Sequence, residues 1–304
     1  MVDDVRPDVL VIQCDSLPPD LVGAYGDLNG ATPNIDALAR RGIRFDASCN
    51  APLCTPSRAS MMTGKLPSRL DCFDNASEFS AEHPTIAHAF RSRGYRTAII
   101  GKMHFLGHDQ HHGFDERLAL DTDYSTGYDP RLYALAYDWD SPSEGNPNSP
   151  QMMGESYLPA PVSLADLLPT LASQIGALLP PDLDGRDLSP ALGGMDAPVD
   201  PFVAEYHGEG VHAPCFMLRD GALKYILVGG RGHHLYDLES DPEERVDLAA
   251  EPAHAAAVEA LRTALLARVD PDDVDRRARA SQRRRSYIHR ALLSGPRAHT
   301  VRSG

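Results

Sequence analysis

The stretch APLCTPSRASMMTG, residues 51–64, combines the start of a helix with a single cysteine in its first turn. Pro56 suits the first turn of a helix, and residues 57–62 are all compatible with helical structure. Cys54 then has two interpretations. It is either a small apolar core residue, as most free cysteines are, or a nucleophile held at a helix N-terminus, where backbone amides and the helix dipole favour negative charge.

Composition restricts the class of protein. The 304 residues allow one large domain, or one large and one small domain, and a hydrophobic content of 42% suits a packed core. The formal net charge of −14 argues against binding to nucleic acid or to an anionic membrane surface. The acidic start does not fit a signal peptide, and no apolar stretch reaches transmembrane length. The five cysteines lack zinc-site spacing, so we expect reduced thiols in a cytoplasmic protein.

Strands and helices alternate in the first third of the chain. Continuous apolar runs over 9–12 and 97–100 predict buried parallel strands, and they lead to Asp15 and Lys102 respectively. Taken singly, these two residues could be a turn former and a surface lysine. Because ligands of parallel α/β sheets bind at the carboxyl ends of the strands, they are also candidates for one site. Around them we expect a short strand over 43–45 and helices over 33–42, 56–63 and 85–93.

A different pattern follows from about residue 121. The stretch 121–161, rich in Ser, Pro, Asn and Gly, predicts an irregular linker. The basic run 276–285 predicts a solvated helix face or a contact with a neighbouring acidic subunit. Between the linker and this run we expect helices over 163–176 and 252–269, and strands within 202–210, 213–221, 223–230 and 234–244.

Two short motifs resemble the signatures of the sulfatase family. They are CTPSR, residues 54–58, and GYRTAIIGKMH, residues 94–104, and they occur in the family's order at a plausible separation. The stretches 32–46, 163–192 and 235–249 resemble further family segments. Five stretches are similar to the choline-sulfatase branch in particular: residues 52–58, 66–79, 101–118, 204–210 and 280–285.

The resemblance implies a fold and a domain organisation. The family's fold is a three-layer α/β/α, alkaline-phosphatase-like mixed sheet with a small C-terminal α+β subdomain. The resemblance implies a catalytic domain over residues 1–195, shortened around 122–160. It also implies a C-terminal subdomain over 196–304 that carries the basic tail.

The resemblance also implies a set of catalytic residues. Cys54 matches the nucleophile, which a maturation enzyme converts to formylglycine in sulfatases, and Arg58 matches the residue that steadies it. Asp15 matches an acid that binds a divalent metal, usually calcium, together with the oxygen of residue 54. Lys102 and His104 match groups that bind the sulfate and assist the hydrated aldehyde.

Other polar residues are weaker candidates. Glu205 and Glu209 resemble positions near the choline head group, where a carboxylate suits a quaternary ammonium ion. We interpret Cys14 and Cys49 as core residues. The histidines are given a structural role because their spacing fits no known metal site: His83, His88, His108, His111 and His112.

Two departures from the family pattern concern the metal. Asp15 is followed by Ser16 rather than by a second acid or an amide, and the chain contains neither Asp-His-Gly nor Asp-Asn-Gly, the element that completes the metal ligands in sulfatases. Asn148-Ser149-Pro150 stands where that element belongs. We therefore expect weak metal binding.

The sequence supports one main functional hypothesis and two alternatives. The main one is hydrolysis of a sulfate ester, with choline O-sulfate as the favoured substrate. The alternatives are a phosphonate or phosphate monoester hydrolase, and a shortened inactive homologue that binds a partner or an anion without turnover. The expected partners are a small sulfate ester, the maturation enzyme and a second copy of the chain through its basic tail.

Overall fold

The computed structural model describes residues 7–15, 17–26, 32–45, 51–118, 162–192, 201–208 and 211–294. The expected linker over 121–161, together with Cys49 and Glu209, lies outside these residues.

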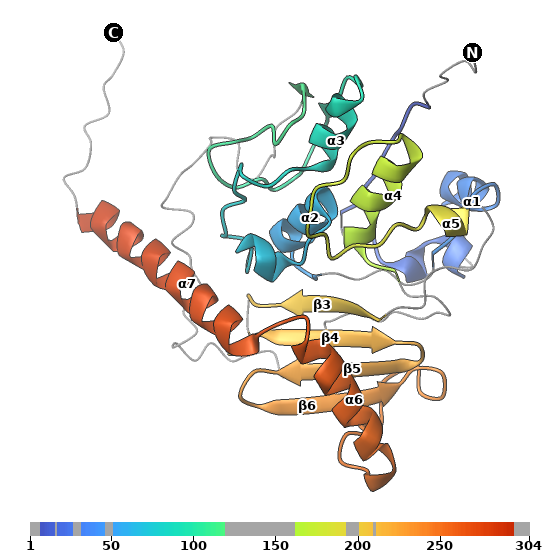
Figure 1. Cartoon of the computed structure of the whole chain (residues 1–304), viewed down its shortest axis with the longest axis vertical. Coiled ribbons are helices and arrows are strands. Elements are labelled where there is room, and N and C mark those ends of the chain that lie inside the picture. Colours follow the sequence, from blue (N-terminus) through green and yellow to red (C-terminus); the bar gives the residue numbers. More distant parts are fainter. Residues whose placement is uncertain are drawn as a thin grey trace.

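Helices dominate the described part of the N-terminal half (Figure 1). The expected helices are confirmed as α1 (Pro33–Ala39), α2 (Cys54–Thr63), α3 (Ile86–Ser92) and α4 (Leu167–Gln174). Shorter helical segments are η1 (Pro19–Leu21), η2 (Gly23–Tyr25), η3 (Pro67–Leu70), η4 (Leu164–Asp166) and α5 (Ser189–Leu192).

Helix α2 is largely buried among these helical segments and ends at Gly64. Gly64 terminates it in the left-handed region, at φ 69°, which glycine adopts without a steric cost. The Gly64 carbonyl then accepts the amides of Asp184 and Gly185 at 2.8 and 3.0 Å. Both ends of α2 are thus held by other segments of the chain, since Asn75 accepts the amide of Thr55 at the N-terminus.

Only one of the two predicted parallel strands forms in the described residues. The run 97–100 yields β1 (Ala98–Ile99), which pairs in parallel with β2 (Glu116–Arg117). The prediction of a buried strand over 9–12 is wrong: Leu10 is 82% exposed and no strand forms there. A strand is stable when neighbours take its hydrogen bonds and cover its side chains, and no described strand pairs with this segment.

Two smaller predictions fail in the same region. Residues 43–45 form no strand, and Cys14, expected in the core, is exposed because the segment that carries it runs along the surface.

The C-terminal half contains a four-stranded antiparallel sheet in sequence order, as its hairpin spacing predicts. Its strands are β3 (Phe202–Tyr206), β4 (Cys215–Asp220), β5 (Leu223–Val228) and β6 (Gly232–Asp237). Alternate side chains point to opposite faces. One face packs against helix α6 (Ala255–Leu266) through Phe216, Leu218, Tyr225 and Leu235. The other face gathers Phe202, Ala204, Met217 and Ile226, with Leu53 against it.

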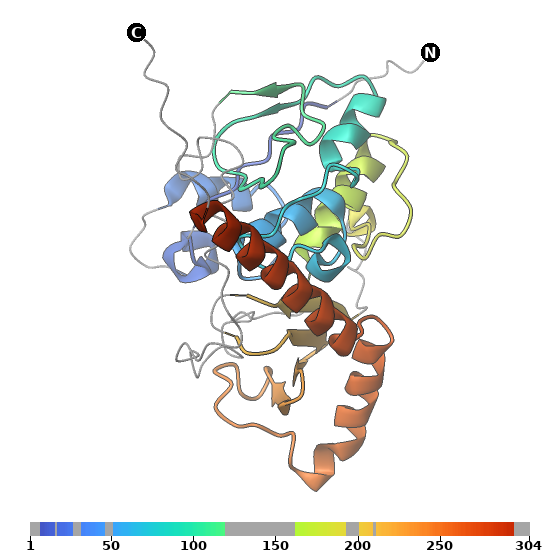
Figure 2. The ribbon, with the colours of Figure 1, turned by 90° about the vertical axis from the view of Figure 1, so that its left-hand side faces the viewer.

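The basic run belongs to the long helix α7 (Pro271–Ser294), which leads from α6 toward the N-terminal helices (Figures 1 and 2). The expectation of a purely solvated face needs correction, because Arg277, Arg279 and Arg285 each contact other parts of this chain. Within the described residues, no helix is both long and apolar enough to cross a membrane.

Two adjacent leucines of α6 test how far the sheet depends on this helix. Leu265 is completely buried in the core between α6 and the sheet, whereas Leu266 is 41% exposed. We expect Leu265→Ala to lower the free energy of unfolding by about 2–5 kcal/mol, and Leu266→Ala by less than about 0.5 kcal/mol. Chemical denaturation followed by circular dichroism measures both; equal losses would show that α6 is not packed as described.

Candidate active site

Cys54 is the first residue of α2, and its side chain is half-buried. The preceding residue, Leu53, is extended and offers no side-chain cap. The cap comes instead from Asn75, whose Oδ1 accepts the amide of Thr55 at 3.0 Å. Because free amides at a helix start attract negative charge, this places the thiol where an anionic nucleophile or ligand is favoured.

Arg58 lies one turn further along α2 and is the centre of the polar contacts. Its side chain is only 5% exposed. Nη1 donates to Gln13 Oε1 at 2.9 Å and to the carbonyl of Lys102 at 2.7 Å, and Nη2 donates to Asp15 Oδ1 at 3.0 Å. One buried guanidinium therefore brings together α2 and the ends of both predicted strand segments.

Lys102 completes an ion-pair group with Asp15. Its Nζ donates to Asp15 Oδ2 at 3.0 Å. This hydrogen bond, together with the positive charges of Lys102 and Arg58, holds the pKa of Asp15 below its usual value, against the opposing effect of burial. Burial alone would lower the pKa of Lys102, but the bond to Asp15 and the attraction of Cys54 outweigh it and raise that pKa. Both groups therefore stay charged at neutral pH.

His104 is buried at the end of the second motif, in an unusual backbone conformation. Its φ is 55°, in the left-handed region that non-glycine residues rarely adopt. Its carbonyl accepts the hydroxyl of Thr55 at 3.2 Å. The second motif thus folds back onto the start of α2, and Cys54, Arg58, Lys102, His104 and Asp15 lie in one region, as the sequence predicts.

Glu205 lies elsewhere and is buried. Its carboxylate accepts the amide of Ser68 at 2.8 Å and the hydroxyl of Ser68 at 2.7 Å, and it lies 3.3 Å from Nε2 of His207. These contacts anchor β3 to η3 and do not support the expected role at a substrate head group, which stays a prediction. Glu209, the other candidate, lies outside the described residues.

Two of the histidines near the second motif, His88 and His112, have structural roles, whereas His108 and His111 are exposed. His88 and Thr85 form a capping box at the start of α3. The ring of His112 is fully buried and stacks on Phe79 at 4.1 Å, and burial lowers its pKa to about 4. A neutral, enclosed ring of this kind contributes to the core rather than to a reaction.

The described residues do not fit a divalent metal as they lie. Asp15 is the one predicted metal carboxylate among them, and each of its oxygens is bound by a cation. In the part of the chain that the structure describes, no three His, Cys, Asp or Glu side chains are grouped so as to hold an ion. Calcium takes six to eight oxygens, so we derive no catalytic step through a metal.

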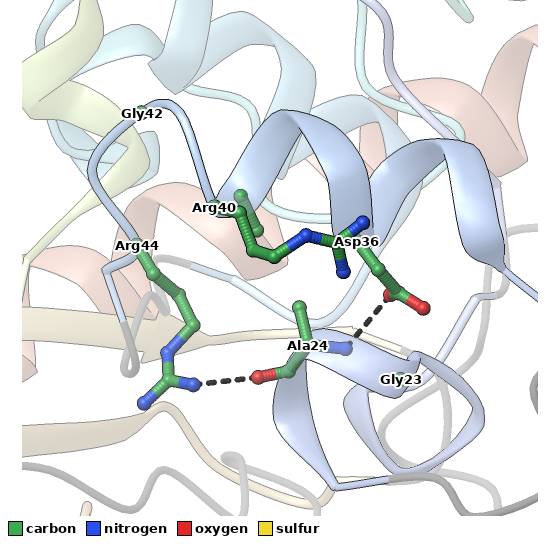
Figure 3. Close-up of a pocket in the computed structure, with 7 residues that line it drawn as sticks. Gly23, Ala24, Asp36, Arg40, Gly42 and Arg44 are labelled. Carbon is green, nitrogen blue, oxygen red and sulfur yellow. Dashed lines mark hydrogen bonds between the residues drawn. The ribbon is translucent and has the colours of Figure 1, made fainter.

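A separate polar hollow of about 430 Å³ lies between α1 and η2 (Figure 3). Asp36 Oδ1 accepts the amide of Ala24 at 2.8 Å, and Arg44 donates to the Ala24 carbonyl at 2.5 Å. The first bond joins α1 to η2, and the second joins the segment after α1 to η2. The hollow contains none of the predicted site residues.

Two site residues have no role in the sequence prediction. Gln13 binds the guanidinium of Arg58, and Asn75 caps α2. Asn75 lies in the stretch that resembles choline-sulfatases, but nothing in a sequence motif shows that a side chain binds a backbone amide 20 residues away.

The Asp15–Lys102 pair can be tested by titration. We expect the Asp15 carboxyl to titrate below its ordinary pKa of 3.8 in a ¹³C NMR experiment, and Lys102→Met to move the midpoint upward. Because the folded-state pKa is lowered, the pair's contribution to stability is present above pH about 4 and is lost as the pH falls through the folded-state value. An unchanged midpoint in Lys102→Met would contradict the pairing.

Sequence comparisons place the motifs in a known family. The Sulfatase family model matches residues 7–151. A choline-sulfatase of Rhizobium meliloti (strain 1021) is 44% identical over 140 residues, which are 44% of this chain and 27% of that protein. Arylsulfatase A of Bos taurus is 30% identical over 229 residues, which are 69% of this chain and 42% of that protein. The chain thus spans less than half the length of these relatives.

Solved structures show the same fold. A 2-O GAG sulfatase superposes with a TM-score of 0.62 at 20% identity, covering 90% of this chain and 92% of that one. The phosphonate monoester hydrolase of Agrobacterium radiobacter gives a TM-score of 0.63 at 17% identity, covering 86% and 95%. The expected alkaline-phosphatase-like α/β fold is confirmed. Residues 7–151 therefore carry a segment of the sulfatase family, and the described fold is the one that sulfatases have.

Proposed function

We propose that this chain carries the nucleophile-bearing part of a sulfatase-type centre, which binds small sulfate monoesters and hydrolyses them slowly in the chain as given. The observation that carries the proposal is the meeting of two separate motifs at one helix start. Cys54 begins α2, and the buried Arg58 one turn later binds both Asp15 and the carbonyl of Lys102. A structural cysteine would not need this assembly of charges.

The charges around Cys54 suit a sulfate group. The first turn of α2, Lys102 and Arg58 all present positive charge or amide dipoles, and Asp15 offsets only one of the two cations. An incoming sulfate can replace the carboxylate of Asp15 on Lys102, whose side chain is 28% exposed, while Arg58 stays buried at 5% exposed. Lys102 therefore binds the substrate, and Arg58 keeps α2 in contact with the segments of Asp15 and Lys102.

Sulfatases use a formylglycine made from the motif cysteine, and residue 54 fits that role. The aldehyde, when present, supplies a hydrated carbon whose oxygen is the nucleophile. The chain's own part is to hold residue 54 at the helix start and to orient the ester through Lys102, with His104 close by. The net reaction takes up water and releases an alcohol, sulfate and a proton.

Choline O-sulfate is the favoured substrate because the choline-sulfatase of Rhizobium meliloti is 44% identical over the matched segment. The likeness to a phosphonate monoester hydrolase is one of fold alone, at 17% identity. Phosphate and phosphonate monoesters carry the same kind of anion, however, and belong in the same assay.

We expect slow turnover because Asp15, the predicted metal ligand, is already paired with Lys102 and Arg58. Charge that develops on the sulfate oxygens needs stabilisation beyond what binds the ground state, and even one donor of this kind is worth about 3–4 kcal/mol. Lys102 binds the ester and the transition state alike, so it contributes to affinity more than to rate.

Metal binding tests the same point independently. We expect calcium to bind no tighter than on the order of millimolar, because Asp15 is neutralised by Lys102 and Arg58 and the described residues add no further carboxylate there. Titration calorimetry measures this, with Asp15→Asn as the control that should not alter the heats. Micromolar affinity that disappears in Asp15→Asn would overturn the prediction.

The function itself is tested with chain co-expressed with a formylglycine-generating enzyme. In sulfatases the motif that this enzyme recognises includes the residues that Pro56 and Arg58 match. Co-expression is required because both residues are buried in the folded chain. Mass spectrometry of the tryptic peptide 45–58 shows whether Cys54 carries the aldehyde. We expect choline O-sulfate to bind saturably, Lys102→Met to weaken binding at least tenfold, and slow sulfate release to vanish in Cys54→Ala.

Three outcomes would contradict the proposal. Absence of sulfate-ester binding removes the site. Sulfate release that persists in Cys54→Ala identifies a contaminant. Faster turnover of a phosphate or phosphonate monoester assigns the centre to the other hydrolase class.

A further inference from the structure

The C-terminal helix reaches the segment that caps the nucleophile helix. Arg285 of α7 donates from Nη2 to Asp74 Oδ2 at 2.5 Å and from Nη1 to Ser77 Oγ at 3.2 Å. The pair is enclosed, since the side chain of Arg285 is 11% exposed and that of Asp74 is 1% exposed. A contact between residues more than 200 positions apart thus lies close to the candidate active site.

Asp74 organises a tight turn over residues 73–77, named here the capping turn. Its Oδ1 accepts the hydroxyl of Ser77 at 2.9 Å and the amide of Ala76 at 3.0 Å. Ser77 Oγ accepts the amides of Phe73 and Asp74 at 3.0 and 3.2 Å. A buried carboxylate is stable only when it is paired, and Arg285 supplies the ion pair.

The capping turn decides where α2 begins. Asn75, between Asp74 and Ser77, caps α2 through the amide of Thr55. The turn also lies against the residue before Cys54: a Cβ built on Gly208 would come within 2.6 Å of Asp74 Cβ and within 3.0 Å of Leu53 Cδ1. The three segments are in close contact, so a shift of the capping turn moves the start of α2.

One face of helix α7 is buried, and Arg285 lies on that face. Its inward side chains are spaced by four, four and three residues, which places them on one helix face: Val274 at 2% exposed, Ala278 at 1%, Gln282 at 7%, and Arg285. Nearer the start of α7, Arg277 contacts the segment just before the capping turn. It donates to the carbonyl of Ser68 at 2.7 Å and pairs with Asp71. Figure 2 shows α7 running across the N-terminal helices.

We propose that Arg285 is a positioning residue: through Asp74 it fixes the capping turn, so that Asn75 caps α2 and Cys54 stays beside Lys102. The importance of Cys54 rests on the function proposed above. The structural claim can be tested on the unmodified thiol.

The test uses a Cys14→Ser/Cys49→Ser background. Cys72 and Cys215 are buried, and burial raises the pKa of both thiols, that of Cys215 to about 12, so Cys54 is the thiol that reacts. The ratio of its alkylation rates with iodoacetate and iodoacetamide measures the positive potential at the thiol, because the two reagents differ in charge.

We expect Arg285→Gln to lower this ratio at least threefold and to speed amide exchange in the peptide 53–58 at least tenfold. Arg285→Lys, which keeps the charge on Asp74, should restore at least half of the ratio. Arg284→Gln, on the exposed side of α7, is the matched control and should change neither quantity.

Asn75→Ala separates positioning from stability. It should reproduce the lowered ratio, and adding Arg285→Gln to it should lower the ratio no further, because both act through one hydrogen bond. An Arg285→Gln protein that melts lower but keeps its ratio would overturn the proposal. If that variant does not fold, Asn75→Ala decides alone, and an unchanged ratio there overturns it. Neither measurement needs turnover, so inactivity toward sulfate esters would refute the proposed function and leave this result standing.

Discussion

The buried guanidinium of Arg58 is the interaction on which the site depends. A charge this enclosed needs several partners, because burying it unpaired is very costly. Gln13 and Asp15 approach from the N-terminal segment, and the Lys102 carbonyl approaches from the loop after β1. Since Arg58 is part of α2, satisfying its donors brings both segments to the helix that starts with Cys54. The CTPSR motif thus has a structural role of its own, in addition to any role in chemistry.

The same contacts are the reason why the proposed function favours binding over reaction. Asp15 is the predicted metal carboxylate, yet Lys102 and Arg58 bind both of its oxygens. Two cations and one carboxylate leave a net positive charge beside the N-terminus of α2, which attracts an anionic ester. They do not provide a strong electrophile for the sulfate oxygens. Under the function proposed above, affinity and turnover would therefore have different origins in this chain and could change independently.

Local patterns in the sequence predicted the elements that local interactions form. Helices α1 to α4 and the four antiparallel strands follow from periodicity, caps and hairpin spacing. The predicted buried strand over 9–12 does not form, because an apolar run becomes a buried strand only where neighbouring strands cover it, and that depends on the rest of the sheet. Motifs predict the candidate site residues Cys54, Arg58, Lys102, His104 and Asp15, and the structure brings these residues into one region. Gln13 and Asn75 were missed, because their roles depend on contacts that no motif records.

The division into a catalytic domain up to residue 195 and a C-terminal subdomain stays a prediction, but the contacts across it set limits on its meaning. Glu205 of β3 accepts the hydroxyl of Ser68, and Arg277 of α7 donates to the Ser68 carbonyl. Arg285 of α7 pairs with Asp74 in the capping turn. The segment that carries the family motifs therefore takes part of its order from residues more than 100 positions away. Because buried polar partners of this kind are lost together, we expect a chain that lacked α7 to keep every predicted catalytic side chain and still to lose the geometry around Cys54.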